Sequence, residues 1–195
     1  NCVTVDQKCQ NDFNVKRADS HFGKPHFFQV NNNVQAMSAY ANDHYDGVKM
    51  QRSVIVIEHS HFEQPLIVDL FRLQSNEHHQ YDFPVHYKGQ VTSTNVNYAY
   101  SDLSRKVLGS ENGYQHLFEV ARAEAEKTSV VTWLQDKTFH SWSSNSDGAE
   151  LIFAQTGAND PAMNLRSETC FILRSNAKSI YQHQEKMAAQ GLSNK

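Results

Sequence analysis

A carboxylate interrupts an apolar segment in the first half of the chain. Asp69 lies within Pro-Leu-Ile-Val-Asp-Leu-Phe-Arg-Leu, a run that otherwise reads as a buried β-strand. An isolated charge is costly to bury, so the side chain must be paired, hydrogen-bonded or bound to a metal ion. A salt bridge to Arg52 or Arg72 and a functional site are both interpretations that the sequence leaves open.

Imidazoles and phenols gather in the segment that follows. Residues 77–87 read Glu-His-His-Gln-Tyr-Asp-Phe-Pro-Val-His-Tyr, with three histidines and two tyrosines. Imidazole binds zinc, and imidazole and phenol both transfer protons, so the segment suits a site that moves protons and holds a metal. The alternative, which composition alone favours, is a polar hairpin whose His and Tyr side chains cover a sheet edge.

Two further segments carry polar side chains suited to sugar recognition. Residues 157–166 read Gly-Ala-Asn-Asp-Pro-Ala-Met-Asn-Leu-Arg, where Asn-Asp-Pro opens a turn and Arg166 can bind a carboxylate through two parallel hydrogen bonds. An equally good interpretation of Asn164 and Arg166 is that they support the loop through hydrogen bonds to its backbone. Residues 112–117, which include His116, either line a sugar site or form a turn that enters a strand, and we favour the turn.

Antiparallel register predicts where these residues meet. Segments 50–57, 66–73 and 84–96 are predicted strands separated by short polar turns, so Gln51 and His86 should both lie near Asp69. Residues directly opposite each other have Cβ atoms about 5 Å apart. We therefore expect three neighbouring strands to bring Asp69, Tyr81 and His86 together at a solvent-exposed rim.

The elements that position them are predicted to be strands. Runs rich in Val, Ile, Thr, Tyr and Phe alternate with polar or Gly/Pro clusters, the pattern of an all-β fold of layered antiparallel sheets with little helix. A helix is predicted only at 184–190, and a turn at 74–79. Trp133 and Trp142 are expected in the core. The other predicted strands are 2–5, 25–30, 34–40, 116–124, 129–134, 137–143, 150–156 and 169–174.

Composition excludes several classes of function. The 195 residues carry a net charge of −3 with interspersed signs, which argues against a nucleic-acid groove. No apolar run approaches the ~18 residues of a membrane span. The mean hydropathy of −0.64 favours sheets with one wet face. The cysteines Cys2, Cys9 and Cys170 lack metal-ligand spacing, and either a Cys2–Cys9 bridge or three buried thiols fits them.

Several ordered segments resemble one known family. The His-Gln-Tyr-Asp-Phe-Pro-Val-His-Tyr segment (79–87), Pro-Leu-Ile-Val-Asp (65–69), Asn-Gly-Tyr-Gln-His-Leu (112–117) and the 157–166 segment resemble those of oligoalginate lyases with heparinase II/III-like C-terminal domains. Val-Thr-Val-Asp (3–6) and Tyr-Asp-Gly-Val (45–48) are similar too. The order is colinear from about residue 1 to about residue 175, so the resemblance is specific.

The resemblance implies layered antiparallel sheets, a β-elimination and a partner domain. In that family the sheet domain packs against an upstream α/α toroid, which supplies the main base and carboxylate-neutralising groups. Members act on alginate, an acidic polysaccharide, and are periplasmic or secreted. Tyr81 is implied as the catalytic acid/base or positioning group, and Asp69 with His86 as ligands of a structural zinc. His79, His116, Asn164 and Arg166 are the implied substrate-binding residues.

Departures from the family pattern bear on these expectations. The family places histidines where this chain has Lys49, Met50 and Gln51, and an amide oxygen is a poorer zinc ligand than imidazole. We divide the chain into a sheet domain at 1–178 and a C-terminal tail at 179–195, with the toroid absent from the sequence. The chain alone is therefore expected to be inactive or weak. The alternatives are a non-catalytic carbohydrate-binding or structural domain derived from a lyase, and a lyase for heparin-like polymers.

Overall fold

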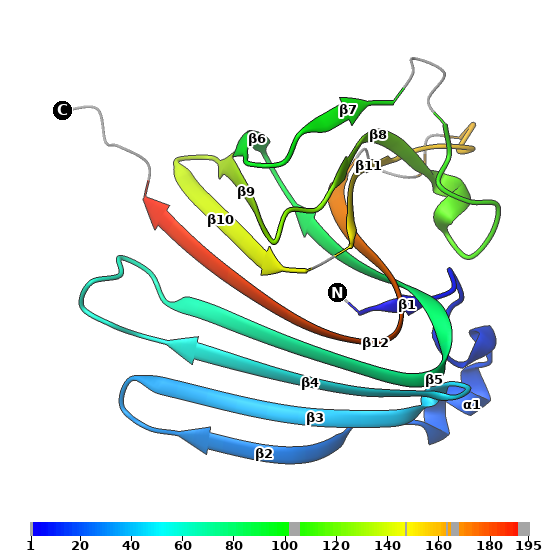
Figure 1. Cartoon of the computed structure of the whole chain (residues 1–195), viewed down its shortest axis with the longest axis horizontal. Coiled ribbons are helices and arrows are strands. Elements are labelled where there is room, and N and C mark those ends of the chain that lie inside the picture. Colours follow the sequence, from blue (N-terminus) through cyan, green and yellow to red (C-terminus); the bar gives the residue numbers. More distant parts are fainter. Residues whose placement is uncertain (1, 102–105, 147, 163, 165–167, 191–195) are drawn as a thin grey trace.

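The computed structural model describes residues 2–101, 106–146, 148–162, 164 and 168–190. It contains a 12-stranded antiparallel sheet that curls over itself (Figure 1), which confirms the all-β prediction. The strands are β1 (Thr4–Val5), β2 (Lys24–Val30), β3 (Val34–Tyr45), β4 (Val48–Ile57), β5 (Leu66–Tyr87), β6 (Gln90–Thr94), β7 (Tyr98–Tyr100), β8 (Leu117–Glu124), β9 (Thr128–Gln135), β10 (Thr138–Asn145), β11 (Glu150–Thr156) and β12 (Thr169–Gln190). The short helical elements are η1 (Gln10–Phe13), α1 (Val15–Ser20) and η2 (Tyr114–His116).

Two long strands run through both layers of the curled sheet. β5 and β12 pair with each other along most of their length, with a register shift between Ala177 and Ser179. The first half of β5 and the second half of β12 belong to the long layer, ordered β2-β3-β4-β5-β12-β10-β9-β6. The remaining halves belong to the short layer. There β1 pairs with β5, β11 pairs with β12, β8 pairs with β11 and β7 pairs with β8. A bulge of this kind lets paired strands bend from one layer into the other.

The core lies between the two layers. Alternate residues of β5 point inward, and Phe71, Leu73, Phe83 and Val85 are nearly inaccessible to solvent. The fully buried Trp142 packs from the long layer against Phe171 of the short layer, with ring centroids 4.8 Å apart. Trp133 is 7% exposed, so both tryptophans occupy the core as expected. Each large side chain buried in this way stabilises the fold by about 1.5–3 kcal/mol.

Two predictions about chain organisation are wrong. The predicted turn at 74–79 is part of the uninterrupted strand β5, because these polar residues lie where the strand bends between layers. The predicted helix at 184–190 is the end of β12, which pairs with β5 on one side and β10 on the other. Hydrogen bonding to two strands overrides the helix propensity of this segment. Residues 179–190 therefore belong to the sheet, and the boundary expected at 178 falls within a strand.

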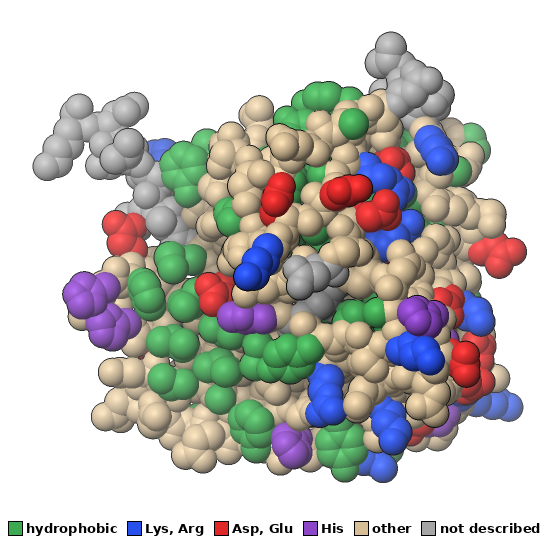
Figure 2. Space-filling view, in the orientation of Figure 1, with side chains coloured by type: hydrophobic (Ala, Val, Ile, Leu, Met, Phe, Trp, Pro, Cys, Tyr) green, Lys and Arg blue, Asp and Glu red, His purple; other side chains and the backbone are tan. Residues whose placement is uncertain are grey.

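Apolar side chains remain exposed on part of the long layer. Figure 2 shows hydrophobic side chains gathered over the lower strands at the left of the molecule. On β2 and β3, Phe28, Val30 and Met37 lie on one face and Phe27 on the other, and all four are 43–75% exposed. Exposed apolar area of this extent commonly marks a contact surface. Within the described ranges, no helix has the length and apolar character needed to cross a membrane.

Candidate functional site

Asp69 is held by an arginine on the inner face of the long layer. The carboxylate is 3% exposed, and Arg52 donates from Nε to Oδ1 at 2.9 Å and from Nη2 to Oδ2 at 2.6 Å. The guanidinium also lies 5.6 Å from the Phe71 ring centroid and 5.8 Å from that of Phe83. This arrangement confirms the salt-bridge interpretation of Asp69, with Arg52 as the partner.

The residues expected to hold zinc do not come together. Val54 is opposite Asp69, while Gln51 is opposite Arg72, so Gln51 and Asp69 point to opposite faces of the sheet. His86 is near the far end of the same strand as Asp69, because β5 has no turn between them. The part of the chain that the structure describes contains no group of three or more His, Cys, Asp or Glu placed to hold a metal. With both Asp69 oxygens bonded to Arg52, these residues do not fit a zinc ion.

Tyr81 is sealed in the core. Its side chain is 0% exposed and its hydroxyl donates to the backbone carbonyl of Lys178 at 3.0 Å. Burial raises the pKa of this phenol. Asp69, Tyr81 and His86 thus lie along one strand in different surroundings, and the expected rim of three neighbouring strands is wrong. The position of Tyr81 gives no support to a direct catalytic role.

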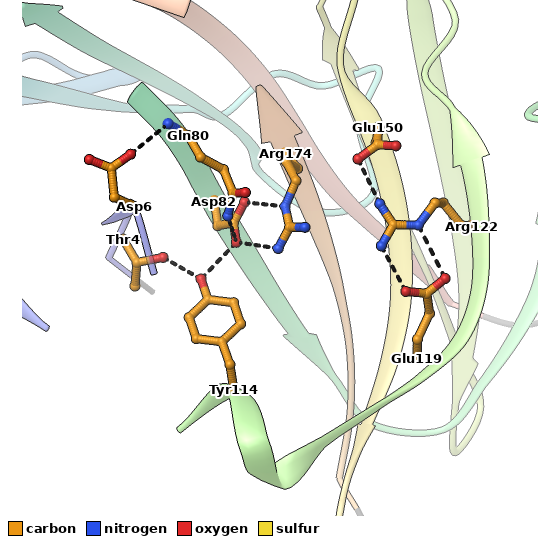
Figure 3. Close-up of polar contacts among 9 residues, drawn as sticks. All are labelled: Thr4, Asp6, Gln80, Asp82, Tyr114, Glu119, Arg122, Glu150 and Arg174. Carbon is orange, nitrogen blue, oxygen red and sulfur yellow. Dashed lines mark hydrogen bonds and ion pairs between the residues drawn. The ribbon is translucent and has the colours of Figure 1, made fainter. Parts of the chain in front are cut away.

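The aspartate after Tyr81 is the centre of a buried polar network (Figure 3). Arg174 donates to Asp82 from Nε and Nη2, both at 2.8 Å, and the Tyr114 hydroxyl donates to Oδ2 at 2.7 Å. Asp82 is 1% exposed and Arg174 8%. Burial and the charge of Asp82 raise the pKa of Tyr114, which is also hydrogen-bonded to Thr4. The network joins β1, β5, β12 and η2.

His79 takes part in a second connection between β1 and β5. Asp6 Oδ2 lies 2.7 Å from His79 Nδ1, and Asp6 Oδ1 accepts from the Gln80 backbone N–H at 2.9 Å. Ser75 Oγ lies 3.1 Å from His79 Nε2. Both ring nitrogens therefore have partners within the protein. The His-Gln-Tyr-Asp motif organises the bend of β5, a role that neither interpretation of the sequence anticipated.

His116, the last residue of η2, contacts the segment that follows β11. His116 Nδ1 is 2.9 Å from the Ala158 carbonyl oxygen, and the Gly157 and Ala158 N–H groups donate to the His116 carbonyl. His116 therefore joins two of the motif segments and acts as a loop anchor. Asn164 is exposed, and Arg166 lies outside the described residues.

His86 lines a cleft at the far end of the short layer. The side chain is exposed and borders a space of about 630 Å³, together with Lys88, Trp133, His140 and Glu168. The His140 ring stacks on Trp133 with centroids 5.4 Å apart and an interplanar angle of 12°. His86 thus lies in a cleft of mixed polar and apolar lining, but Asp69 and Tyr81 do not line it.

A row of polar side chains crosses the outer face of the long layer. Register places Lys24 opposite Tyr40, Tyr40 opposite Gln51, Gln51 opposite Arg72 and Arg72 opposite Tyr181. Directly opposed residues share a face, so the five side chains form one line across β2, β3, β4, β5 and β12. Tyr40 is 36% exposed and Tyr181 65% exposed.

A shallow groove of about 190 Å³ lies at the centre of this row. We call it the outer groove; its lining residues are Tyr40, Asn42, Lys49, Met50, Gln51, Arg72 and Gln74. Lys49 is opposite Gln74, one row from Arg72. No lining residue is acidic, and among the described side chains no Asp or Glu forms an ion pair with Lys49 or Arg72. Two cations, amides and a phenol suit the carboxylate and hydroxyl groups of an acidic sugar.

The sequence held a partial signal for the outer groove. In the sequence, Lys49 and Gln51 stand out only as departures from a histidine pattern, and Arg72 only as a possible partner of Asp69. Their shared face emerges from the β3–β4–β5 register, which depends on the observed hairpin lengths. A strand alternation anchored on the inward Met50 and Phe71 would have placed Gln51 and Arg72 together on the outer face.

Comparison with known proteins gives a consistent result. Residues 1–187 match the family model described as heparinase II/III-like, C-terminal. The chain is 32% identical over 176 residues to an alginate lyase of Stenotrophomonas maltophilia and 30% identical over 179 residues to an exo-oligoalginate lyase of Saccharophagus degradans. Each match covers 89% of this chain but only 24% of the relative. The chain therefore spans about a quarter of the length of these relatives.

Solved structures share the fold. A heparinase III superposes with a TM-score of 0.62 at 12% identity, over 98% of this chain and 24% of its own. The heparan sulfate lyase of Pedobacter heparinus gives a TM-score of 0.55 at 11% identity, over 88% of this chain and 22% of its own. At these identities the likeness establishes the arrangement of strands and no more.

Proposed function

The chain belongs to the heparinase II/III-like C-terminal family, and on that premise we propose that it is the sheet domain of a polysaccharide lyase that cleaves alginate by β-elimination. The observation that carries the proposal is the outer groove, where Lys49 and Arg72 are exposed without an acidic partner in the described structure. The names of the two relatives at 30–32% identity favour alginate as the polymer.

In this proposal the outer groove binds the carboxylate of a uronate unit. Arg72 can donate two parallel hydrogen bonds to the two carboxylate oxygens, and Lys49 supplies a second positive charge one row away. Abstraction of the C5 proton moves negative charge onto that carboxylate, so fixed cations stabilise the enolate more than the ground state. Tyr181 lies beside Arg72 in the row and Tyr40 lies beyond Gln51, and both offer ring faces to the sugar.

In this proposal, the base and the acid of the elimination are side chains of a region other than the sheet domain. Tyr81 is buried and hydrogen-bonded to Lys178, so the proton transfers require other groups. We propose that an α/α-toroid region, such as the resemblance implies, supplies them. Phe27, which is 43% exposed and lies on the same face of the layer as Tyr40, offers an apolar contact for that region beside the outer groove.

A non-catalytic carbohydrate-binding domain is the second candidate. The burial of Tyr81 favours it, because a binding domain needs the cations of the outer groove but no proton-transfer group. The two candidates differ in one readout. A lyase domain joined to its toroid forms an unsaturated product that absorbs in the ultraviolet, and a binding domain does not.

Calorimetric titration tests the shared premise of both candidates. The purified chain is titrated with a saturated alginate hexasaccharide, and Arg72→Ala and Lys49→Ala are compared with Lys137→Ala, an exposed lysine in the β9–β10 turn. Loss of a charge-assisted hydrogen bond costs about 1.5–3 kcal/mol, so each groove variant should bind about 10–150-fold more weakly. Equal affinity in all three variants would refute the site. Tighter binding of a heparan sulfate hexasaccharide would reassign the polymer.

A further inference from the structure

A further cleft lies where β6, at the end of the long layer, faces the β7–β8 pair of the short layer. We call it the tyrosine cleft. Its space of about 410 Å³ lies between β6 and the β7–β8 pair and falls within the range of about 300–1,000 Å³ that is typical of small-molecule sites. Its walls include the aromatic rings of Tyr98, Tyr100 and Phe153 and the hydroxyls of Thr92, Ser93 and Thr94.

The aromatic wall results from the pairing of β7 with β8. Tyr98 is opposite Ala123 and Tyr100 is opposite Ala121, and these small residues leave room above them for two rings. The tyrosine rings lie 5.3 Å apart with an interplanar angle of 87°, and Phe153 lies 5.9 Å from Tyr98. The neighbouring phenol of Tyr100 raises the pKa of Tyr98.

These rings are exposed to an unusual degree for a β-sheet protein. Tyr98 is 44% exposed and Tyr100 74% exposed, although both point to the face that elsewhere forms the core. Aromatic side chains contribute most when a partner covers them. A ligand that covers the two rings would recover this burial, so the exposed rings indicate a binding surface.

The absence of charged side chains from the lining of the cleft favours an uncharged ligand. None of its lining residues is Asp, Glu, Lys, Arg or His, so a carboxylate or sulfate would lose hydration without gaining a counter-charge. The hydroxyls of Thr92 and Thr94 donate to the backbone oxygens of Thr132 and Val130, at 3.2 and 2.7 Å. The Thr94 oxygen also accepts from the Val96 N–H at 3.4 Å, and each hydroxyl oxygen keeps a lone pair for a hydrogen bond from a ligand, which favours a ligand with hydroxyl groups.

We propose that the tyrosine cleft is a second saccharide-binding site, which takes an uncharged pyranose unit through stacking on Tyr98 and Tyr100. The apolar C–H face of the sugar covers the rings, and its hydroxyls donate to Thr92 and Thr94. The site shares no residue with the outer groove and differs from it in charge. It therefore does not depend on the proposed lyase activity, and it extends the protein's ligands to neutral glycans.

Calorimetry with neutral oligosaccharides tests this site. The intact chain is titrated with β-1,4-glucan, β-1,4-mannan and β-1,3-glucan hexaoses, each at about 0.01 M and about 1 M NaCl. We expect at least one hexaose to bind with little dependence on salt, and Tyr98→Ala and Tyr100→Ala to weaken it about tenfold or more. Phe139→Ala removes an aromatic side chain of similar exposure on β10 and should not change the affinity.

Three results would overturn the proposal. The first is that none of the three hexaoses binds. The second is that a hexaose binds equally well to wild type, Tyr98→Ala and Tyr100→Ala. The third is that wild type is a dimer that either substitution dissociates, which would assign the rings to contact with a second copy. A loss of alginate binding in Arg72→Ala with intact hexaose binding leaves this site standing and bears only on the outer groove.

Discussion

Replacing Arg174 with methionine should strongly destabilise the domain. Asp82 is 1% exposed, and the substitution removes both guanidinium hydrogen bonds at 2.8 Å, leaving Tyr114 and Gln80 as its remaining side-chain donors. Removal of one partner from a buried ion pair costs about 3–5 kcal/mol. For a domain of 150–250 residues each kcal/mol shifts Tm by about 2–4 °C, so we expect a fall of about 6–20 °C.

Two comparison variants make this prediction specific to burial. Arg122→Met breaks ion pairs with Glu119 and Glu150, but Arg122 is 32% and Glu150 39% exposed, so water can replace part of these bonds and the expected cost is about 1–2 kcal/mol. The double variant Asp82→Leu/Arg174→Met removes both charges and should recover much of the lost stability. Urea unfolding followed by circular dichroism measures all three. Equal losses for Arg174→Met and Arg122→Met would refute the reasoning.

Three further predictions concern the residues that the sequence singled out. Adding ZnCl₂ or EDTA should leave Tm unchanged, because Arg52 occupies the Asp69 carboxylate; a zinc-dependent rise in Tm would contradict the ion-pair assignment. Tyr81→Phe should lose about 0.5–1.5 kcal/mol of unfolding free energy with the Lys178 hydrogen bond and leave alginate affinity intact; a change in affinity alone would return Tyr81 to the site. Burial raises the pKa of Cys170 to about 11. The unfolded chain therefore releases this proton first, and stability should fall by on the order of 2 kcal/mol as pH rises from about 9 to about 11. Cys170→Ala should lack this part of the fall in urea titrations, and an unchanged pH dependence would argue against the burial of the thiol.

The positions of most strands were predictable from local pattern. Runs of strand-forming residues in 50–57 and 150–156 predict strands that match β4 and β11 within about two residues. β5 was divided into two strands because Asn76, Glu77 and His78 read as a turn. These residues are exposed at the bend opposite the β12 register shift, a feature set by pairing far along the chain.

The candidate site was less predictable than the fold. The predicted turn at 74–79, which the structure does not contain, puts His86 beside Asp69. An error in the predicted register puts Gln51 on the face of Asp69. A one-residue shift reverses the face of every side chain in a strand, so small errors of register change the whole site. The family resemblance identified the fold correctly, while several of its motif residues, such as Asp82 and His116, hold the fold together.

The central claim is that an acidic sugar binds at the outer groove of the long layer. The most direct measurement is a chemical-shift map of the ¹⁵N-labelled chain titrated with an alginate trisaccharide. We predict that the largest changes fall on backbone amides of Tyr40, Lys49, Gln51, Arg72 and Tyr181. Changes confined to the neighbours of His86, Trp133 and His140, or to the tyrosine cleft, would contradict the account.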